Sequence, residues 1–246
     1  MKHNRRFFLK TTGAAAAFTL AHNSGFSMGL QSTKKRKPVT IAQVDSQFER
    51  EPLIRPFGFK GGDMSEIWQT IAMMKSTSGV EKLGLCTQSV LWSDAKVFAG
   101  HSEAAGNAIM YTMSERALQL CKGKTFTTPV DLVDEILEEV YEYGKEVSGN
   151  PHLRKTFALN ALVGVDNAAW LLHATENGIT NFDDLIPEAY RPSLSSHHEK
   201  VASIPLMAYT IPISEIKQAT DEGYFFMKIK IGQPGTQKEM LQKDME

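Results

Sequence analysis

Two lysines, Lys228 and Lys230, stand one residue apart in the apolar run Phe225–Gly232. In an extended strand successive side chains point to opposite faces, so the two lysines share one face and the apolar residues beside them share the other. A strand in a parallel sheet is normally covered on both faces, and two ammonium groups held close together there lower each other's pKa. A lysine with a lowered pKa can accept a proton near neutral pH. The alternative is a solvent-facing edge strand whose lysines discourage aggregation, and the spacing alone favours that alternative.

The elements on either side of the lysines change this balance. The pattern predicts a buried strand over Val201–Thr210, a helix over Ile213–Gly223, a second strand over Tyr224–Ile231 and another helix from Gly235. A strand, a helix and a strand joined by short links require a parallel sheet with covering helices. The two lysines then lie near the carboxyl end of the second strand, where (β/α) barrels place their catalytic groups.

A different architecture is predicted upstream. Three strand-like runs, Val39–Val44, Glu66–Met73 and Lys82–Val90, are consistent with an antiparallel meander, since Ser76–Gly79 has the composition of a turn. The segment Leu53–Gly62 between the first two runs is rich in Gly and Pro, which predicts a loop. We expect this loop to expose its aromatic residues.

Three helices are predicted between the meander and the final strands. Apolar residues repeat at helical spacing over Ile109–Cys121, and Thr128–Pro129 begins a second helix with one apolar stripe. A third helix, over Leu153–Glu176, is apolar nearly all round, which predicts burial between layers. The expected fold class is therefore an α+β domain followed by the beginning of an α/β domain.

From Val39 onward the chain resembles the enolase superfamily, and within it the mandelate racemase and muconate lactonizing enzyme group. Three segments carry the resemblance: the meander with its Arg55–Phe57 loop, the helix containing Ala161–Leu172, and the strand Lys228–Gly232. The resemblance implies an N-terminal capping domain followed by the first two βα units of an incomplete TIM-like barrel. It makes Lys230 the catalytic lysine and Lys228 the neighbour that tunes it.

The resemblance also implies a chemistry. Enzymes of this family remove the proton next to a carboxylate of a small molecule and stabilise the resulting enediolate with Mg²⁺, because the developing charge needs a cation. Phe57, Phe59 and Lys60 correspond to a loop over the active site, and His101 and Glu103 to a second such loop. Substrate selection is the hypothesis for these residues, and packing within the loops is the alternative. The family takes its metal ligands from the third to fifth barrel strands. A barrel needs about 250 residues and residues 201–246 provide about one and a half units, so the ligands are expected beyond Glu246.

These expectations divide the chain into a leader at 1–37, a capping domain with its linking helix at 38–195 and a truncated barrel start at 196–246. The favoured function is the N-terminal part of a racemase, epimerase or cycloisomerase, inactive as this fragment, with a homo-oligomer left open for a full-length form. A sugar-acid dehydratase of the same superfamily is an alternative. A non-catalytic exported remnant or binding module is another.

The leader has its own signature. Arg5 and Arg6, followed by an aromatic pair, Leu and Lys, precede the weakly apolar run Gly13–Ala21, and this order resembles a twin-arginine export signal. The run is shorter than the roughly 20 residues that a membrane span needs. The signal implies a periplasmic or exported protein, and a basic amphipathic helix or a disordered tail is the alternative reading.

Composition limits the remaining function classes. The 27 Lys and Arg residues nearly balance 28 Asp and Glu, and 42% of residues are hydrophobic, which is typical of a globular protein. This near-neutrality gives no electrostatic support for nucleic acid or anionic lipid as a partner, and no stretch of the mature chain is apolar enough to enter a membrane. The two cysteines, Cys86 and Cys121, are expected to be free and buried, although an oxidising periplasm would allow them to pair.

Overall fold

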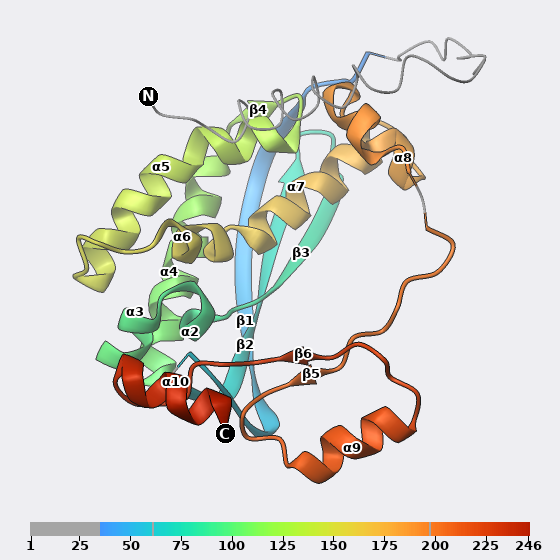
Figure 1. Cartoon of the computed structure of the whole chain (residues 1–246). Coiled ribbons are helices and arrows are strands. Elements are labelled where there is room, and N and C mark those ends of the chain that lie inside the picture. The colour runs from blue at the N-terminus through green and yellow to red at the C-terminus, as the bar shows by residue number, and fades with distance from the viewer. Residues whose placement is uncertain (1–34, 61, 197) are drawn as a thin grey trace.

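The structure is a computed structural model that describes residues 35–60, 62–196 and 198–246 (Figure 1). The export segment predicted at Arg5–Ala21 lies outside these residues. None of the described helices is long and apolar enough to span a membrane.

A four-stranded antiparallel sheet forms the centre of the molecule, with strand order β3-β2-β1-β4. Its strands are β1 (Val39–Phe59), β2 (Gly62–Ser76), β3 (Glu81–Thr87) and the short β4 (Thr125–Phe126). The predicted meander is confirmed, and β4 adds a fourth strand that pairs with the beginning of β1. The sequence pattern missed β4 because two residues carry no measurable alternation.

The first two strands are much longer than predicted. The segment expected to form a loop over Leu53–Gly62 instead continues β1 to Phe59, turns tightly at Lys60 and enters β2 at Gly62. The prediction of an irregular loop was wrong, because the strand remains extended and its pairing with β2 resumes at Phe57–Phe59. A register shift between Pro52 and Phe57 accommodates the four residues that do not fit the ladder.

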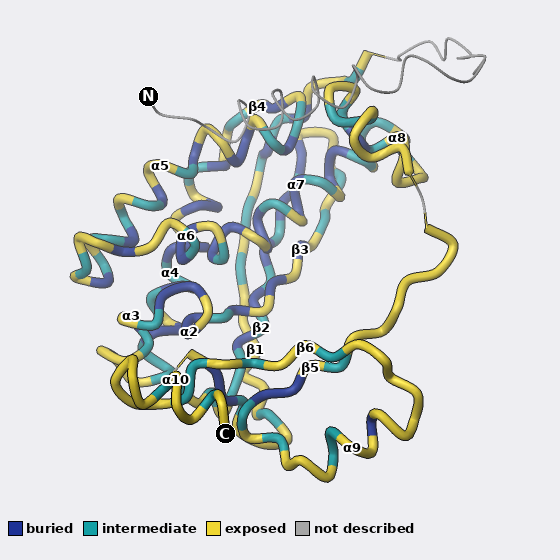
Figure 2. Tube along the Cα trace, in the orientation of Figure 1, coloured by how far each residue is buried: buried dark blue, intermediate teal, exposed yellow. Residues whose placement is uncertain are grey.

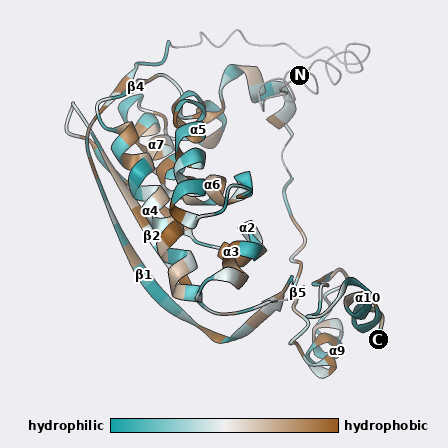
Figure 3. Cartoon of the chain, turned by 90° about the vertical axis from the view of Figure 1, so that its left-hand side faces the viewer, coloured by the Kyte–Doolittle hydropathy of each residue, from teal (hydrophilic) through white to brown (hydrophobic). Residues whose placement is uncertain are grey.

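Burial alternates along β2, which shows that one face of this sheet is covered. Its even-numbered residues from Trp68 to Ser76 are buried, whereas the residues between them are half-buried. Helices α4 (Glu103–Cys121) and α7 (Val163–Glu176) provide most of the helical contact with the three long strands, and they lie against the buried face (Figure 3). A second helical layer is built by α5 (Pro129–Ser148), which packs on α4 and α7.

Local capping fixes the ends of these helices. The Ser102 hydroxyl accepts the Ala105 amide at the start of α4, and the Thr128 hydroxyl accepts the Asp131 amide at the start of α5. Gly149 ends α5 with φ of 61°, a left-handed conformation that glycine adopts readily. Two short helices, α2 (Val90–Ser93) and α3 (Ala95–Gly100), connect β3 to α4.

The predicted third helix is divided into two. It forms α6 (Lys155–Ala161) and α7, which meet at Leu162, and it is not buried all round, because Leu159 and Leu171 are exposed. The chain continues through α8 (Phe182–Leu185) and the 3₁₀ helix η1 (Glu188–Leu194). Figure 2 shows the burial concentrated where the helices face the sheet.

The last fifty residues form a separate strand-helix-strand-helix unit, below the sheet in Figure 1. Its elements are β5 (Leu206–Met207), α9 (Ile213–Asp221), β6 (Lys228–Ile229) and α10 (Gln237–Met245). The predicted order and the parallel pairing of β5 with β6 are confirmed. Both strands are far shorter than predicted, since only two residue pairs form and Val201 and Ile204 are exposed.

Candidate active site

The parallel pair of strands fixes the backbone of both candidate lysines. Leu206 pairs with Lys228 and Met207 with Ile229. The Lys228 amide donates to the Pro205 carbonyl at 2.9 Å, and the Lys230 amide donates to the Met207 carbonyl at 2.7 Å. Lys230 therefore stands immediately past the carboxyl end of β6, held to the end of β5.

The tip of the β1–β2 hairpin, which we define as residues 57–60 and 62, meets the carboxyl ends of these strands. The Tyr209 hydroxyl, just after β5, donates to the Gly62 carbonyl at 2.7 Å. Gly58 lies so close to the Tyr209 ring that an added Cβ would be 2.4 Å from it. Nearby, Arg55 binds Glu215 through two 2.7 Å contacts, and this ion pair lowers the pKa of the Glu215 carboxyl.

The hairpin tip covers one lysine more than the other. The Lys230 ammonium lies 4.9 Å from the centroid of the Phe59 ring, a cation–π distance, and the residue is half-buried. Phe59 is only 4% exposed and packs against Phe57 at 5.4 Å between ring centroids, so the expectation of exposed aromatics fails at Phe59. Lys228 is exposed. Lys230 is thus the lysine that the hairpin tip contacts.

Lys60 supplies a second ammonium group beside this contact. It stands in the turn with φ of 51° and donates to the Trp92 carbonyl at 2.8 Å. Its pKa is lowered, mainly by partial burial and then by the positive charge of Arg154, with a further contribution from Lys230, while Asp94 acts in the opposite direction. The structure therefore brings Phe57, Phe59, Lys60 and Lys230 together and leaves Lys228 at the edge.

The strand that carries the lysines is not covered on both faces by the described chain. Ile229 and Ile231 are 65% and 67% exposed. The expectation of a strand covered on both faces was wrong for the described residues, because only β5 pairs with β6 and no described element packs over the apolar face.

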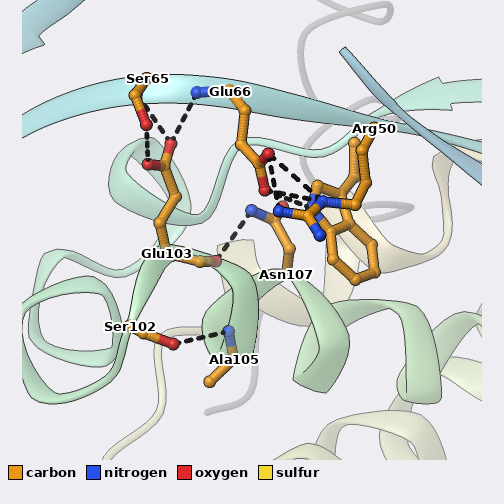
Figure 4. A network of polar contacts seen from close by, with 8 residues as sticks. Arg50, Ser65, Glu66, Ser102, Glu103, Ala105 and Asn107 are labelled. Atoms are coloured by element: carbon orange, nitrogen blue, oxygen red, sulfur yellow. Dashed lines mark hydrogen bonds and ion pairs between the residues drawn. The ribbon is translucent and has the colours of Figure 1, made fainter. Parts of the chain in front are cut away.

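A carboxylate that the sequence pattern did not single out as a clamp holds the hairpin in place (Figure 4). Glu103, the first residue of α4, accepts the Ser65 amide at 2.9 Å, the Ser65 hydroxyl at 2.6 Å and the Glu66 amide at 3.1 Å. On the same strand Glu66 pairs with Arg50 at 2.9 Å, which lowers the pKa of Glu66. Glu103 was expected in a second loop over the active site, and the structure places it in the first turn of α4 instead. Its contacts with β2 could not be read from the sequence, because the partners are about 37 residues away.

The described residues do not supply a metal centre. Across residues 35–60, 62–196 and 198–246, no group of three or more His, Cys, Asp or Glu side chains is placed to hold a metal ion. The described donor set therefore does not fit the Mg²⁺ that the resemblance implies. Both cysteines are free and buried, as expected, and burial raises the pKa of Cys121 to about 12.

No family model matches the chain, and no curated protein is similar to it. Solved structures do match. L-talarate/galactarate dehydratase from Salmonella typhimurium LT2, liganded with Mg and L-lyxarohydroxamate, matches at a TM-score of 0.50 and 18% identity, over 91% of this chain and 52% of that one. Dipeptide epimerase from Enterococcus faecalis V583, complexed with Mg and L-Leu-L-Tyr, matches at a TM-score of 0.49 and 18% identity, over 83% and 48%.

A third structure, a mandelate racemase/muconate lactonizing enzyme-like protein from Rubrobacter xylanophilus, matches at a TM-score of 0.48 and 14% identity, over 83% of this chain and 48% of that one. These proteins are members of the enolase superfamily. The chain spans about half the length of the solved structures that it matches. The likeness to the dehydratase concerns the fold: an N-terminal capping domain and part of a barrel.

Proposed function

We propose that this chain provides the capping domain and the general base of an enolase-superfamily enzyme that removes the proton next to a carboxylate. The observation that carries this proposal is the position of Lys230, past the carboxyl end of β6 and 4.9 Å from the Phe59 ring of the hairpin tip. In (β/α) barrels catalytic groups lie at the carboxyl ends of the strands. A lysine confined there is placed to meet a substrate, whereas a lysine that only protects an edge strand needs no such contact.

In this proposal Lys230 accepts the proton from the carbon next to the substrate carboxylate. The carboxylate of the substrate gains negative charge as the proton leaves, and the ammonium group of Lys60 is a cation already in place at the turn. Phe57 and Lys60 offer the accessible surface of the hairpin tip to the rest of the substrate, and the buried Phe59 ring supports Phe57. Solved neighbours are complexed with Mg, but the described donor set does not hold it, so the roles assigned to this chain end with the lysines and the hairpin tip.

Within this superfamily, we also propose a type of reaction. We favour a racemase or epimerase, or a cycloisomerase, in which the proton or a bond returns to the same carbon. A sugar-acid dehydratase begins with the same proton removal and then expels a hydroxyl group from the neighbouring carbon. A non-catalytic module would have the same capping domain but no exchange of any substrate proton.

The test is proton exchange by the complete product of the reading frame. The protein is incubated in D₂O with Mg²⁺ and either galactarate or L-Leu-L-Tyr, and proton NMR follows the loss of the proton next to the carboxylate. Lys230→Ala should abolish exchange. Lys230→Arg should do the same, since arginine keeps the charge beside Phe59 but cannot lose its proton near neutral pH.

Lys82→Ala, which changes a lysine of β3 on the central sheet, is the matched control and should retain exchange. Incorporation of deuterium next to the carboxylate without loss of a hydroxyl group indicates epimerisation. Loss of the hydroxyl group on the neighbouring carbon indicates dehydration. Phe57→Ala should change the ratio of the exchange rate with galactarate to the exchange rate with L-Leu-L-Tyr. Unaltered exchange in Lys230→Ala would remove this lysine from the mechanism, and no exchange of either compound by the parent protein would favour the non-catalytic module.

We also propose that the chain is exported to the periplasm through its twin arginines. Replacing Arg5 and Arg6 by lysine keeps the charge but should leave the protein in the cytoplasmic fraction, because the signal is specific for arginine. Replacing Lys34 and Lys35 by arginine is the control and should leave localisation unchanged. Immunoblots of periplasmic and cytoplasmic fractions measure both, and a periplasmic double-lysine variant would contradict the proposal.

A further inference from the structure

A mainly apolar groove of about 780 Å³ lies on the far side of the capping domain from Lys230. It runs between the edge strand β3, one side of α7, the beginning of α5 and the α8–η1 segment. Its lining comprises Leu83, Leu85, Val130, Asp134, Asn167, Trp170, Leu171, Phe182, Leu185, Ile186, Pro187, Tyr190, Ser193 and Leu194. We call this feature the β3–α8 groove.

Several large side chains of the β3–α8 groove are exposed in the described structure. Phe182 is 70% exposed, Leu85 is 63% exposed and Leu171 is exposed by about half. A contiguous apolar surface of this kind is a site where another segment or molecule binds. The Asn167 side-chain amide donates to the Leu85 carbonyl at 2.8 Å, so this carbonyl on the edge of β3 already has a hydrogen-bond partner. The groove therefore favours side-chain insertion over addition of a further strand.

The chain itself enters the described structure beside this groove. The Arg36 guanidinium donates to the carbonyl of Asp184 in α8, next to the lining residue Leu185. The Lys37 amide donates to the Asn177 side chain at 2.7 Å, just after α7. Residues 36 and 37 are thus fixed between the ends of the two helices that form the groove.

The sequence before this point contains a segment of matching chemistry. The run Gly13–Ala21 is apolar and carries Phe18 and Leu20. Thirteen residues lie between Ala21 and Lys35, so 14 steps along an extended chain reach up to about 46 Å. This reach is ample for a groove that begins beside residue 36.

We propose that the apolar run Gly13–Ala21 of the leader binds in the β3–α8 groove of its own chain, with Phe18 and Leu20 as the inserted side chains. The groove is then covered while the leader is attached and becomes open when the leader is removed. The folded capping domain therefore binds its own leader, and removal of the leader exposes the apolar β3–α8 groove. This inference is independent of the proton-removal chemistry.

Side-chain oxidation by hydroxyl radicals, read by mass spectrometry on the full 246-residue chain, tests the proposal. In the parent protein Leu171 and Phe182 should be oxidised slowly. The double variant Phe18→Asp with Leu20→Asp should oxidise both several-fold faster, because charged residues leave an apolar groove. The matched control, Thr11→Asp with Thr12→Asp, adds the same charge outside the run and should behave as the parent. Phe225, which is highly exposed at the other end of the molecule, serves as the internal reference.

A cross-link identifies the occupant. Phe18→Cys combined with Phe182→Cys should form a disulfide within one chain on mild oxidation, because the native Cys86 and Cys121 are buried and do not compete. Equal oxidation of Leu171 and Phe182 in the parent and the Phe18/Leu20 variant would overturn the proposal. A cross-link found only between two chains would overturn it as well, in favour of a second copy as the occupant.

Discussion

At the scale of single residues, Lys230 shows how a flexible side chain is confined at the end of a two-residue strand. Its backbone is held by the Met207 carbonyl and its ammonium by the Phe59 ring, so both ends of the residue are restrained. Lys60 approaches the same region from the opposite element, where Gly232 lies against its backbone.

His173 provides a prediction about pH. It is 3% exposed on α7, and its pKa is lowered by burial and, to a smaller extent, by the charge of Arg36. The unfolded chain therefore binds the proton more readily than the folded chain, and this contribution to stability is complete above the usual histidine pKa of about 6.5. The free energy of unfolding should fall as the pH is lowered through that value towards the folded-state pKa.

Urea unfolding at several pH values between about 7 and 5 measures this effect. His173→Gln should remove that part of the pH dependence, whereas the control His152→Gln, at an exposed histidine, should retain it. A parallel loss of stability in the parent and His173→Gln would assign the pH dependence to other groups.

The sequence was informative about single residues where chemistry depends on spacing within one element. The place of Lys230 at the carboxyl end of a short parallel strand could be predicted from the strand-helix-strand pattern, whereas a shared role for Lys228 and Lys230 stays a prediction. The contact of Lys230 with Phe59 could not be deduced from spacing, since about 170 residues separate the partners. The clamp made by Glu103 depends equally on a packing arrangement that no local pattern encodes.

At the scale of elements, α7 approaches the sheet closely because small residues face each other. An added Cβ at Gly84 of β3 would lie 2.0 Å from the Gly164 carbonyl oxygen and 2.3 Å from the Ala168 amide nitrogen. Both are backbone atoms of α7, which cannot move without moving the helix. The helix and the strand therefore touch through their backbones at this point.

Gly84→Ala should destabilise the protein by about 3 kcal/mol or more, because the added methyl group forces the helix away from the sheet. Chemical unfolding followed by circular dichroism measures the change. Gly100→Ala is the matched control, since an added Cβ at Gly100 meets nothing within 4 Å. If both variants unfold at the same urea concentration, the close contact does not contribute as described.

Element types were predicted better than element lengths. The strand-helix-strand order near the carboxyl end follows from hydrophobic periodicity, and the start of α5 follows from Thr128 and Pro129. The extended hairpin was missed because Pro56 and Gly58 are turn residues in most contexts, whereas pairing with β2 on both sides of the register shift keeps β1 extended. Long-range pairing outweighs local propensity in strands.

At the scale of the whole molecule, the strand-helix-strand-helix unit is attached through the connecting segment after η1 and through the hairpin tip. Tyr209 is central to the second attachment, since its ring packs on Gly58 and its hydroxyl binds the Gly62 carbonyl. The Arg55–Glu215 ion pair is about half exposed at both side chains and contributes little by comparison.

Tyr209→Ala should release this unit from the hairpin while the central sheet remains folded. Limited proteolysis with mass spectrometry should show faster cleavage within residues 198–246 and unchanged resistance of residues 62–194. Tyr190→Ala, at the β3–α8 groove, is a matched tyrosine control and should not accelerate cleavage of residues 198–246. Equal cleavage in Tyr209→Ala and the parent would show that the hairpin tip does not hold the unit.

The register shift in the hairpin separates a long paired shaft from a short end piece. Beyond the shift only three residue pairs remain, Phe57 with Met64, Gly58 with Asp63 and Phe59 with Gly62. This end piece rests on its surroundings, since Phe59 is 4% exposed and an added Cβ at Gly62 would lie 3.1 Å from the Phe98 ring. A turn grafted here would therefore have to reproduce these contacts, whereas the long shaft keeps its own cross-strand pairing.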